Sequence, residues 1–317
     1  MQFLKKVFRI VILIFEPLTI IPTIFFSFYL KFLRIIGIHN LPITLKVFKR
    51  IGIFPIINHY YEPLFSESDI SKSLSSRRSL NGIDWNIQEQ LKLLEYFSYS
   101  EEFEDFVLSD SPFFFGNGSF EGGDAEYLYN FIRHFKPQKI IEVGCGNSTL
   151  IIHEALKHNS EQNQDCNHIS IEPFEAQWLE SYGVKTYREK IELIDLSYFN
   201  QLESGDFLFI DSSHIIRPQG DVIFEILEIL PNLKKGVFVH FHDIFSPNDY
   251  PEDWVFNKVR FWNEQYLLEA FLSNNDSWRI IGALNLLNES YKDEFKKILL
   301  NSNSSITPGS FYIYKHK

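Results

Sequence analysis

The chain has 317 residues, 45% of them hydrophobic and 16% aromatic, which allows a large core and excludes global disorder. Thirty basic and 41 acidic residues give a net charge of −11, which argues against a general nucleic-acid binder, because such proteins carry a basic surplus. The two cysteines, Cys145 and Cys166, exclude a disulfide framework and are consistent with a reducing compartment.

The N-terminal part begins with an apolar run. Residues 10–30 carry one charge, Glu16, and are long enough to span a bilayer. Pro17 and Pro22 interrupt the run, and basic residues flank it on both sides, so the positive-inside rule assigns no orientation. We expect residues 1–63 to form a hydrophobic helical segment that associates with a membrane through residues 10–30, spanning it or lying in its interface. A buried helical hairpin is the alternative interpretation.

A polar region follows the apolar segment. Residues 64–84 are rich in serine and predict a linker, and the apolar spacing of residues 85–108 predicts a helix. We expect residues 64–117 to form a linker and a helical cap. A glycine-punctuated stretch, residues 113–128, then leads into a predicted helix over 124–134.

Residues 118–317 alternate between strand and helix patterns. Strands are predicted over residues 139–143, 168–172, 206–211, 236–243, 278–284 and 310–315, and helices over 148–158, 217–230, 254–273 and 289–300. This alternation predicts an α/β domain, a three-layer sandwich in which helices cover both faces of a mostly parallel sheet.

The residues that follow each strand are the candidates for a binding site, because ligands of such sheets bind beyond the carboxyl ends of the strands. After the first strand, Gly144 and Gly146 permit a tight turn before a helix. After the second, Glu172 could accept hydrogen bonds from both hydroxyls of a ribose. A dinucleotide-binding loop would need a third glycine, but Thr149 occupies that position.

The acid-x-Gly-x-Gly pattern that starts at Glu142 resembles the S-adenosylmethionine site of class I methyltransferases. FIDSSH (209–214) and VHFHDIF (239–245) resemble the macrocin-type and cephalosporin-biosynthesis branch (methyltransferase family 24-like). SFYIYK (310–315) resembles the antiparallel last strand of their seven-stranded, Rossmann-like sheet, and GNGSFEGGDAEYLY (116–129) resembles the segment that closes over the cofactor. The resemblance implies these cofactor-binding residues: Glu142, Gly144, Gly146, Ser148, Thr149, Glu172, Asp124 and, near the adenine after a third strand, Asp195.

The same resemblance implies a reaction centre after the fourth and fifth strands. In that branch, acids at the positions of Asp211, His242 and Asp243 bind a divalent metal such as Mg²⁺. This chain has His242 where the branch has an acid, and imidazole shifts the preference toward metals such as Mn²⁺. The alternative is that the two aspartates cap helices or contact the sulfonium end of the cofactor. With Asp211, His214 is the catalytic candidate, as the general base, because imidazole titrates near neutrality; a loop histidine bonded to a backbone carbonyl is the alternative.

Together, these features predict S-adenosylmethionine-dependent methyl transfer to a hydroxyl of a glycan, lipid-linked or secondary-metabolite acceptor. The catalytic domain is expected at the cytoplasmic face of a membrane or in the cytoplasm, where this cofactor is made. Two alternatives belong to other classes: a nucleotide-linked oxidoreductase or epimerase, and a non-catalytic membrane-anchored binding module.

Overall fold

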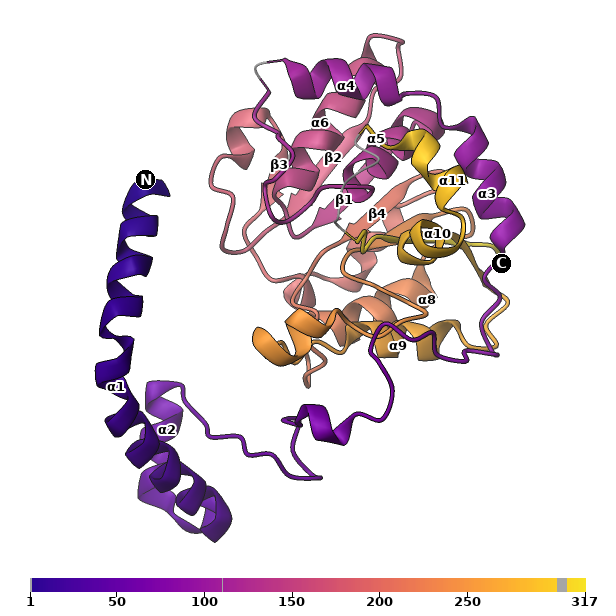
Figure 1. Cartoon of the computed structure of the whole chain (residues 1–317). Helices are drawn as coiled ribbons and strands as arrows, with labels where there is room; N and C mark the ends of the chain where they lie inside the picture. Colours follow the sequence, from indigo (N-terminus) through magenta and orange to yellow (C-terminus); the bar gives the residue numbers. More distant parts are fainter. Residues whose placement is uncertain (1, 110, 301–306) are drawn as a thin grey trace. The chain divides into compact units, whose positions relative to one another are not determined.

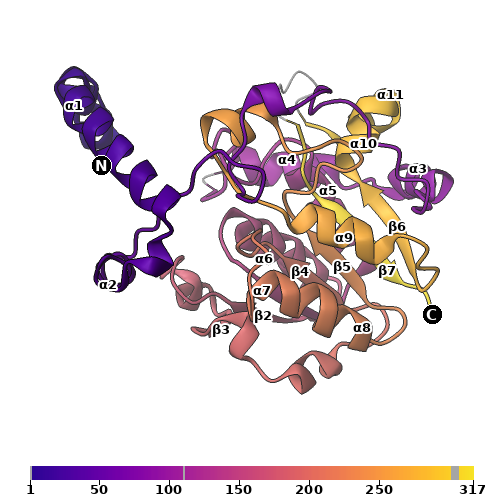
Figure 2. The same ribbon diagram turned by 90° about the horizontal axis from the view of Figure 1, so that it is seen from below.

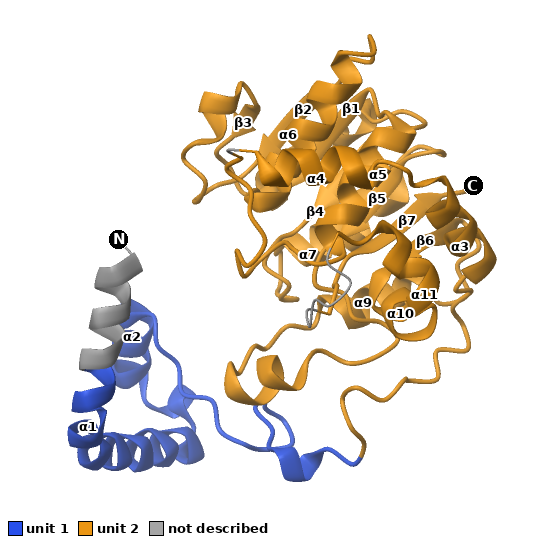
Figure 3. Cartoon of the chain, turned by 45° about the horizontal axis from the view of Figure 1, so that its top comes forward, with its two compact units in different colours: residues 1–71 blue, residues 72–317 orange. Residues whose placement is uncertain are grey.

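The computed structural model describes residues 2–109, 111–300 and 307–317, with side chains described from residue 12 onward. The chain divides into two compact units, Met1–Ser71 and Lys72–Lys317 (Figure 3). This division groups most of the predicted linker and cap, residues 64–117, with the sheet that follows.

The first unit consists mainly of two helices (Figure 1). α1 runs over Gln2–Ile36 and α2 over Pro42–Ile51, with short 3₁₀ turns at Ile38–Asn40 and Glu67–Asp69. Pro17 and Pro22 lie inside α1 and do not end it. Within the described residues, one helix is long and apolar enough to cross a membrane, over Ile12–Ile36, with a mean hydropathy of 1.7.

The second unit is built on a seven-stranded sheet in the order β3-β2-β1-β4-β5-β7-β6. All neighbouring strands are parallel except β7, which runs antiparallel to β5 and β6. The predicted seven-stranded, mostly parallel sheet is therefore confirmed. For the six strands whose residue ranges were predicted, the observed ends lie within two residues of the predicted ends. The strands are β1 Lys139–Val143, β2 Asn167–Ile171, β3 Lys185–Tyr187, β4 Phe207–Ile210, β5 Phe238–Phe241, β6 Trp278–Ala283 and β7 Phe311–Lys315.

Helices lie on both faces of this sheet (Figures 1 and 2). The sequence connects them in the order α3 Ile87–Tyr96, α4 Ser100–Leu108, α5 Asp124–Phe135, α6 Asn147–Ser160, α7 Asp221–Ile223, α8 Leu230–Asn232, α9 Glu264–Leu272, α10 Leu284–Ser290 and α11 Lys292–Phe295. A π-helical turn, Phe224–Ile229, joins α7 to α8. Short 3₁₀ turns occur at Leu179–Tyr182, Ile191–Leu193, Leu196–Gln201 and Lys296–Ile298.

Two hydrophobic clusters separate the three layers, because successive strand residues point to opposite faces. Ile140 and Phe207 pack in the cluster that contains the apolar side chains of α5 and α6. Their neighbours Ile141 and Leu208 pack in the other cluster, with the π-helical turn and α9. Both faces of the central strands are thus covered, which explains why their sequences are nearly continuous apolar runs.

The predicted helix over residues 254–273 is wrong in its first half, whereas its second half forms as α9. Only a π-helical turn, Asp253–Asn257, forms at its start, and α9 begins at Glu264. Between them the guanidinium of Arg260 packs 4.3 Å from the ring centre of Trp254 and 4.1 Å from that of Trp262. This packing of large aromatic rings overrides the helical spacing of the sequence. The predicted helix over 289–300 is also wrong in extent, because Tyr291 is not helical and separates α10 from α11.

A partly buried ionic network fastens α4 to α5 and α6. The guanidinium of Arg133, on α5, donates to both carboxylate oxygens of Glu102, on α4, at 2.5 and 3.0 Å, and also to Asn159 on α6. The hydroxyl of Tyr129 donates to the same carboxylate. Burial acts to raise the pKa of Glu102, but the bonds from Arg133 and Tyr129 hold that pKa below its ordinary value.

We therefore expect Glu102→Gln to destabilise the protein in a pH-dependent way. A carboxylate whose pKa is depressed on folding contributes stability above its unfolded pKa of about 4.3 and loses that contribution as the pH falls through the folded value. The loss in the free energy of unfolding should be about 2 kcal/mol near pH 7 and much smaller near pH 3. Urea denaturation at both pH values measures it.

Glu104→Gln is the matched control for this prediction, because Glu104 is an exposed acid on the same helix. Its effect should stay within about 0.5 kcal/mol at either pH. A Glu102→Gln loss that is the same at both pH values would show that the charge of Glu102 is not what fastens α4.

Candidate active site

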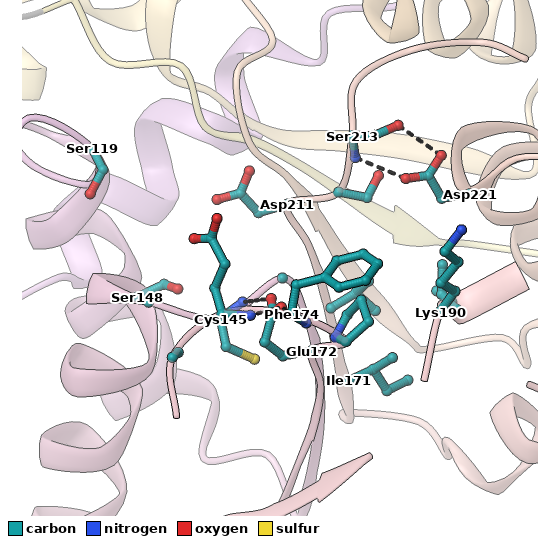
Figure 4. Close-up of a pocket in the computed structure, with 18 of the residues that line it drawn as sticks. Ser119, Cys145, Ser148, Ile171, Glu172, Phe174, Lys190, Asp211, Ser213 and Asp221 are labelled. Carbon is teal, nitrogen blue, oxygen red and sulfur yellow. Dashed lines mark hydrogen bonds between the residues drawn. The ribbon is translucent and has the colours of Figure 1, made fainter. Parts of the chain in front are cut away.

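A cavity of about 960 Å³ opens at the carboxyl ends of β1, β2 and β4 (Figure 4). Its walls come from the turns after these strands, from Ser119 and Phe120 before α5, and from the chain between β3 and β4. The residues that line it include Gly144, Cys145, Gly146, Ser148, Glu172, Phe174, Lys190, Glu192, Asp211 and Asp221. The cavity thus lies where the topology of a parallel sheet predicts a ligand.

The glycine turn after β1 forms the floor of this cavity. Gly144 has a φ of 72°, and a Cβ added there would lie 1.8 Å from the carbonyl oxygen of Asp211. Two independent reasons therefore require glycine at position 144: its backbone is left-handed, and the backbone that follows β4 approaches it closely. At Gly146 nothing lies within 4 Å of the position that a Cβ would take, so the missing side chain leaves room in the cavity rather than relieving a contact.

Glu142 supports this turn from beneath and does not line the cavity. Its fully buried carboxylate accepts hydrogen bonds from the hydroxyls of Ser148, at 2.8 Å, and Thr149, at 2.9 Å. His168 of β2 lies 2.9 Å from its other oxygen. Thr149 also accepts a bond from the N–H of Gly146, at 3.1 Å. Of the residues predicted to bind the cofactor, Glu142 and Thr149 therefore hold the glycine turn in shape, whereas Ser148 reaches the cavity wall.

Glu172 lies on the cavity wall at the end of β2, as predicted. One carboxylate oxygen accepts the N–H groups of Phe174 and Glu175, both at 2.8 Å, and the other accepts the N–H of Cys145 at 3.3 Å (Figure 4). These bonds fix the carboxylate while its remaining lone pairs can still accept hydrogen bonds from a ligand. Burial raises the pKa of the Cys145 thiol well above its ordinary value, which makes that thiol a poor nucleophile.

The acid beside the third strand is a different residue from the one predicted. Asp195 is exposed, caps the 3₁₀ turn that follows it by accepting the N–H of Ser197 at 2.8 Å, and does not line the cavity. Glu192, three residues earlier, lines the cavity instead. The segment after β3 therefore reaches the cavity, and Glu192, in the short 3₁₀ turn at Ile191–Leu193, is its acid on the cavity wall.

A cluster of acids and imidazoles lies at one end of the cavity. Asp211 belongs to this cluster and also lines the cavity. Possible metal ligands at Asp211, His214 and Asp243 lie within 4.8 Å of one another. Nε2 of His214 is 3.3 Å from a carboxylate oxygen of Asp211 and 3.6 Å from one of Asp243. Both His214 and Asp243 have positive φ angles, 61° and 58°, so two strained turns hold these side chains together.

His242 and Asp124 lie on the inner side of this cluster. Nδ1 of His242 is 3.5 Å from Asp211 and 3.7 Å from Asp243, while its Nε2 is 3.6 Å from Asp124. The carboxylate of Asp124 accepts the N–H groups of Gly309 and Ser310, at 3.1 and 2.8 Å. Asp124, predicted to bind the cofactor, therefore ties α5 to the chain before β7 and does not line the cavity.

The charges of Asp211, His214 and His242 stabilise one another. Burial acts to lower the pKa of His214, but hydrogen bonds to Asp211 and Glu264 raise that pKa to about 10. Burial likewise opposes charge on His242, yet Asp243 and Asp211 raise its pKa well above the ordinary value. In return, the two imidazoles hold the pKa of Asp211 well below its ordinary range although burial acts to raise it. The cluster is therefore a site built to hold positive charge against carboxylates.

Two functional candidates carried no signal in the sequence. Glu264, the first residue of α9, is buried, and its carboxylate lies 2.8 Å from Nδ1 of His214. The ring of Trp262 packs 4.2 Å from the imidazole of His214. Glu264 is 50 residues away from His214 in the chain. Trp262 and Glu264 reach the site where the chain leaves the predicted helix, between the π-helical turn that ends at Asn257 and the start of α9. His240, interpreted as a core residue, is fully buried and stacks on Phe209.

Parts of this chain are similar in sequence to known proteins. Residues 141–244 match a family model described as a methyltransferase domain (methyltransferase family 24). An uncharacterized protein of Archaeoglobus fulgidus is 31% identical over 174 residues, which cover 48% of this chain and 75% of the relative.

Two solved structures are similar at low identity. One is the O-methyltransferase TomG from Streptomyces achromogenes, solved with SAM, with 13% identity, a TM-score of 0.39 and coverage of 71% of this chain and 90% of TomG. The other is the O-methyltransferase from Bacillus cereus, solved with SAH, with 12% identity, a TM-score of 0.37 and coverage of 71% and 91%. At these scores neither structure bears on the acceptor or on a metal in this chain.

The two glycines of the turn predict opposite outcomes when each is replaced by alanine. Gly144→Ala should cost more than about 3 kcal/mol of stability, because the new methyl group meets the Asp211 carbonyl and the backbone is left-handed. Gly146→Ala should stay within about 1 kcal/mol, because nothing lies within 4 Å of the new methyl group. Chemical denaturation measures both, and equal losses would contradict the assigned roles.

Proposed function

Because residues 141–244 match a methyltransferase domain, we propose that this chain is a class I methyltransferase that transfers the methyl group of S-adenosylmethionine to a hydroxyl oxygen of its acceptor. One observation carries the proposal: the cavity has a fixed carboxylate, Glu172, on its wall and a histidine–carboxylate cluster at its end, joined through Asp211. The first suits a nucleoside, and the second suits a hydroxyl that must lose a proton. We further propose a glycan, lipid-linked or secondary-metabolite acceptor.

The cavity residues divide the work of binding. When bound there, S-adenosylmethionine supplies a methyl carbon that is made electrophilic by its sulfonium. The backbone N–H groups at the start of α6 and the hydroxyl of Ser148 would hold the methionine end, and Glu172 would accept hydrogen bonds from the ribose hydroxyls. We propose that Glu192, rather than Asp195, lies near the adenine, because Glu192 lines the cavity and Asp195 does not.

His214 is proposed to take the proton of the acceptor. Methyl transfer would form the bond from the acceptor oxygen to the methyl carbon and break the carbon–sulfur bond, giving a methyl ether and S-adenosylhomocysteine, and the hydroxyl proton would pass to Nε2 of His214. Because the pKa of this imidazole is raised in the ligand-free protein, His214 must first release its own proton as the cationic cofactor and the acceptor bind. Glu264 orients this ring through Nδ1, and Trp262 packs against it. A base held by a carboxylate in this way keeps its second nitrogen aimed at the reacting proton.

The cluster also fits a divalent metal, which we propose it binds. Asp211, Asp243 and His214 offer two carboxylates and one imidazole within 4.8 Å of one another, and His242 stands beside them. The predicted ligand set was Asp211, His242 and Asp243, so the geometry adds His214 as a competing nitrogen ligand. Mixed nitrogen and oxygen ligands favour Mn²⁺, Fe²⁺ or Zn²⁺ over Mg²⁺. A metal there would orient an acceptor hydroxyl and lower its pKa. His214 cannot bind it through Nε2 and receive the proton there at once, so the ligand assignment and the base assignment exclude each other.

The macrocin-type and cephalosporin-biosynthesis branch is the proposed place of this chain among its relatives. Support comes from an acid directly after β4, Asp211, and from His242 and Asp243 directly after β5. The family match favours methyl transfer over the oxidoreductase or epimerase alternative.

Calorimetry with S-adenosylhomocysteine tests the cofactor site. We expect Glu172→Ala to weaken binding at least about tenfold, because a hydrogen bond to a charged group is worth roughly 1.5–3 kcal/mol. Asp195→Asn is the matched control and should leave the affinity unchanged, since Asp195 is exposed and outside the cavity. Unchanged affinity in Glu172→Ala would refute the ribose assignment, and tight binding of NAD would refute the proposed function.

The transfer itself is tested with methyl-labelled S-adenosylmethionine and a lipid and metabolite extract of the source cells. Label should enter a product that resists mild alkaline hydrolysis, as an ether does and an ester does not. His214→Gln should abolish this incorporation while S-adenosylhomocysteine still binds. Incorporation that survives His214→Gln would exclude His214 as the base.

Titration with Mn²⁺ alone tests the metal proposal. Asp211→Asn and Asp243→Asn should each weaken Mn²⁺ binding at least about tenfold, as for loss of a metal ligand or its close support. Asp276→Asn, at an exposed acid far from the cluster in sequence, should not change it. His214→Gln and His242→Gln decide which imidazole is the ligand, because only that variant should show a comparable loss. No binding to the unaltered protein would remove the metal from the proposal.

A further inference from the structure

Most of the described apolar side chains of the first unit are exposed. Of the 33 exposed large hydrophobic residues in the described part of the chain, 24 lie within residues 12–65. The same region buries two hydrophobic residues, Leu33 and Ile38. A patch of this extent needs a partner, because soluble proteins rarely expose large contiguous apolar surfaces.

The apolar surface of α1 surrounds the helix. Exposed large hydrophobic residues occupy the consecutive positions 12–15 and recur through residue 36, so they point in every direction around the axis. A helix that docks on a protein needs one apolar face, whereas a helix in lipid is apolar all round. The 25 residues of its apolar stretch, Ile12–Ile36, extend about 37 Å, compared with about 30 Å for a hydrocarbon core.

α2 has the pattern of a helix that lies flat on a membrane. Ile43, Val47 and Ile51 recur every four residues along one side and are 80%, 47% and 63% exposed. Lys46, Lys49 and Arg50 alternate with them on the rest of the helix. An apolar stripe flanked by cations matches the boundary between acyl chains and headgroups.

Charge identifies the kind of membrane. The chain carries a net charge of −11, yet residues 17–61 contain no Asp or Glu and five Lys or Arg residues. One of these, Arg34, pairs with Glu62. The other four form no ion pair within the part of the chain that the structure describes: Lys31, Lys46, Lys49 and Arg50. Such a basic juxtamembrane segment is attracted to anionic lipids.

We infer that residues 12–65 anchor the protein to an anionic phospholipid membrane, with α1 inserted in the hydrocarbon and α2 in the headgroup layer. The anchor does not depend on the methyl transfer proposed above. The catalytic unit belongs on the cytoplasmic face, where S-adenosylmethionine is made.

Vesicle flotation of the full chain, purified in a nonionic detergent and then mixed with preformed lipid, tests this inference. The protein should float with phosphatidylcholine vesicles and bind more tightly when phosphatidylglycerol is included. Lys46→Gln, Lys49→Gln and Arg50→Gln together should lower the partition coefficient for the anionic vesicles at least about tenfold, because each cation near the surface adds to the attraction. The floated protein should resist extraction by alkaline carbonate.

The matched control replaces three exposed lysines of the second unit, Lys92, Lys235 and Lys297, by glutamine. It removes the same charge and should leave flotation unchanged. Ile20→Asp with Ile24→Asp should make the bound protein extractable by carbonate while the thermal unfolding of the second unit is kept. Protein that stays unbound as a defined oligomer would assign the apolar surface to a second copy and overturn the inference, as would equal losses in the charge variant and its control.

Discussion

The close approach of two backbones at the end of the sheet is the constraint on which the site depends. The N–H of Asp211 donates to the carbonyl of Val143 at 2.9 Å, and the N–H of Gly144 donates to that of Ile171 at 3.1 Å, so β1 stays clamped between β4 and β2 to its last residue. Only glycine at 144 allows this contact. The same clamp sets the floor of the cavity, places Cys145 against Glu172 and positions Asp211 in the histidine–carboxylate cluster.

Electrostatic balance is the second principle of the site. Asp211, Asp243 and Glu264 surround His214. Glu264 is buried and the two aspartates are partly buried, and gathering three such carboxylates is costly unless positive charge lies among them. Protonated imidazoles supply that charge in the ligand-free protein, and a divalent cation could supply it in their place. The arrangement therefore suits a centre where a proton leaves a hydroxyl and a methyl cation equivalent arrives.

Local patterns predicted much of this fold but failed where distant side chains compete with them. Buried strands were visible as short apolar runs, and the strand-end residues Glu172, Asp211 and Asp243 were identified from their positions alone. The first half of the helix predicted over residues 254–273 does not form, and in its place the guanidinium of Arg260 packs on the rings of Trp254 and Trp262. That failure concealed Glu264, since its partner His214 lies 50 residues away in the chain.

The sequence by itself determined the α/β class, the order of the strands along the chain, the glycine turn and the apolar N-terminal segment, because each depends on residues that are neighbours in the chain. Only the tertiary structure decided which acids face the cavity and which support it. Glu142 lies beneath the glycine turn and outside the cavity, Glu192 rather than Asp195 lines the cavity, and His214 lies beside Asp211 and Asp243. The physical reason is that a side chain's role follows from the partners that satisfy it, and these come from other strands and loops.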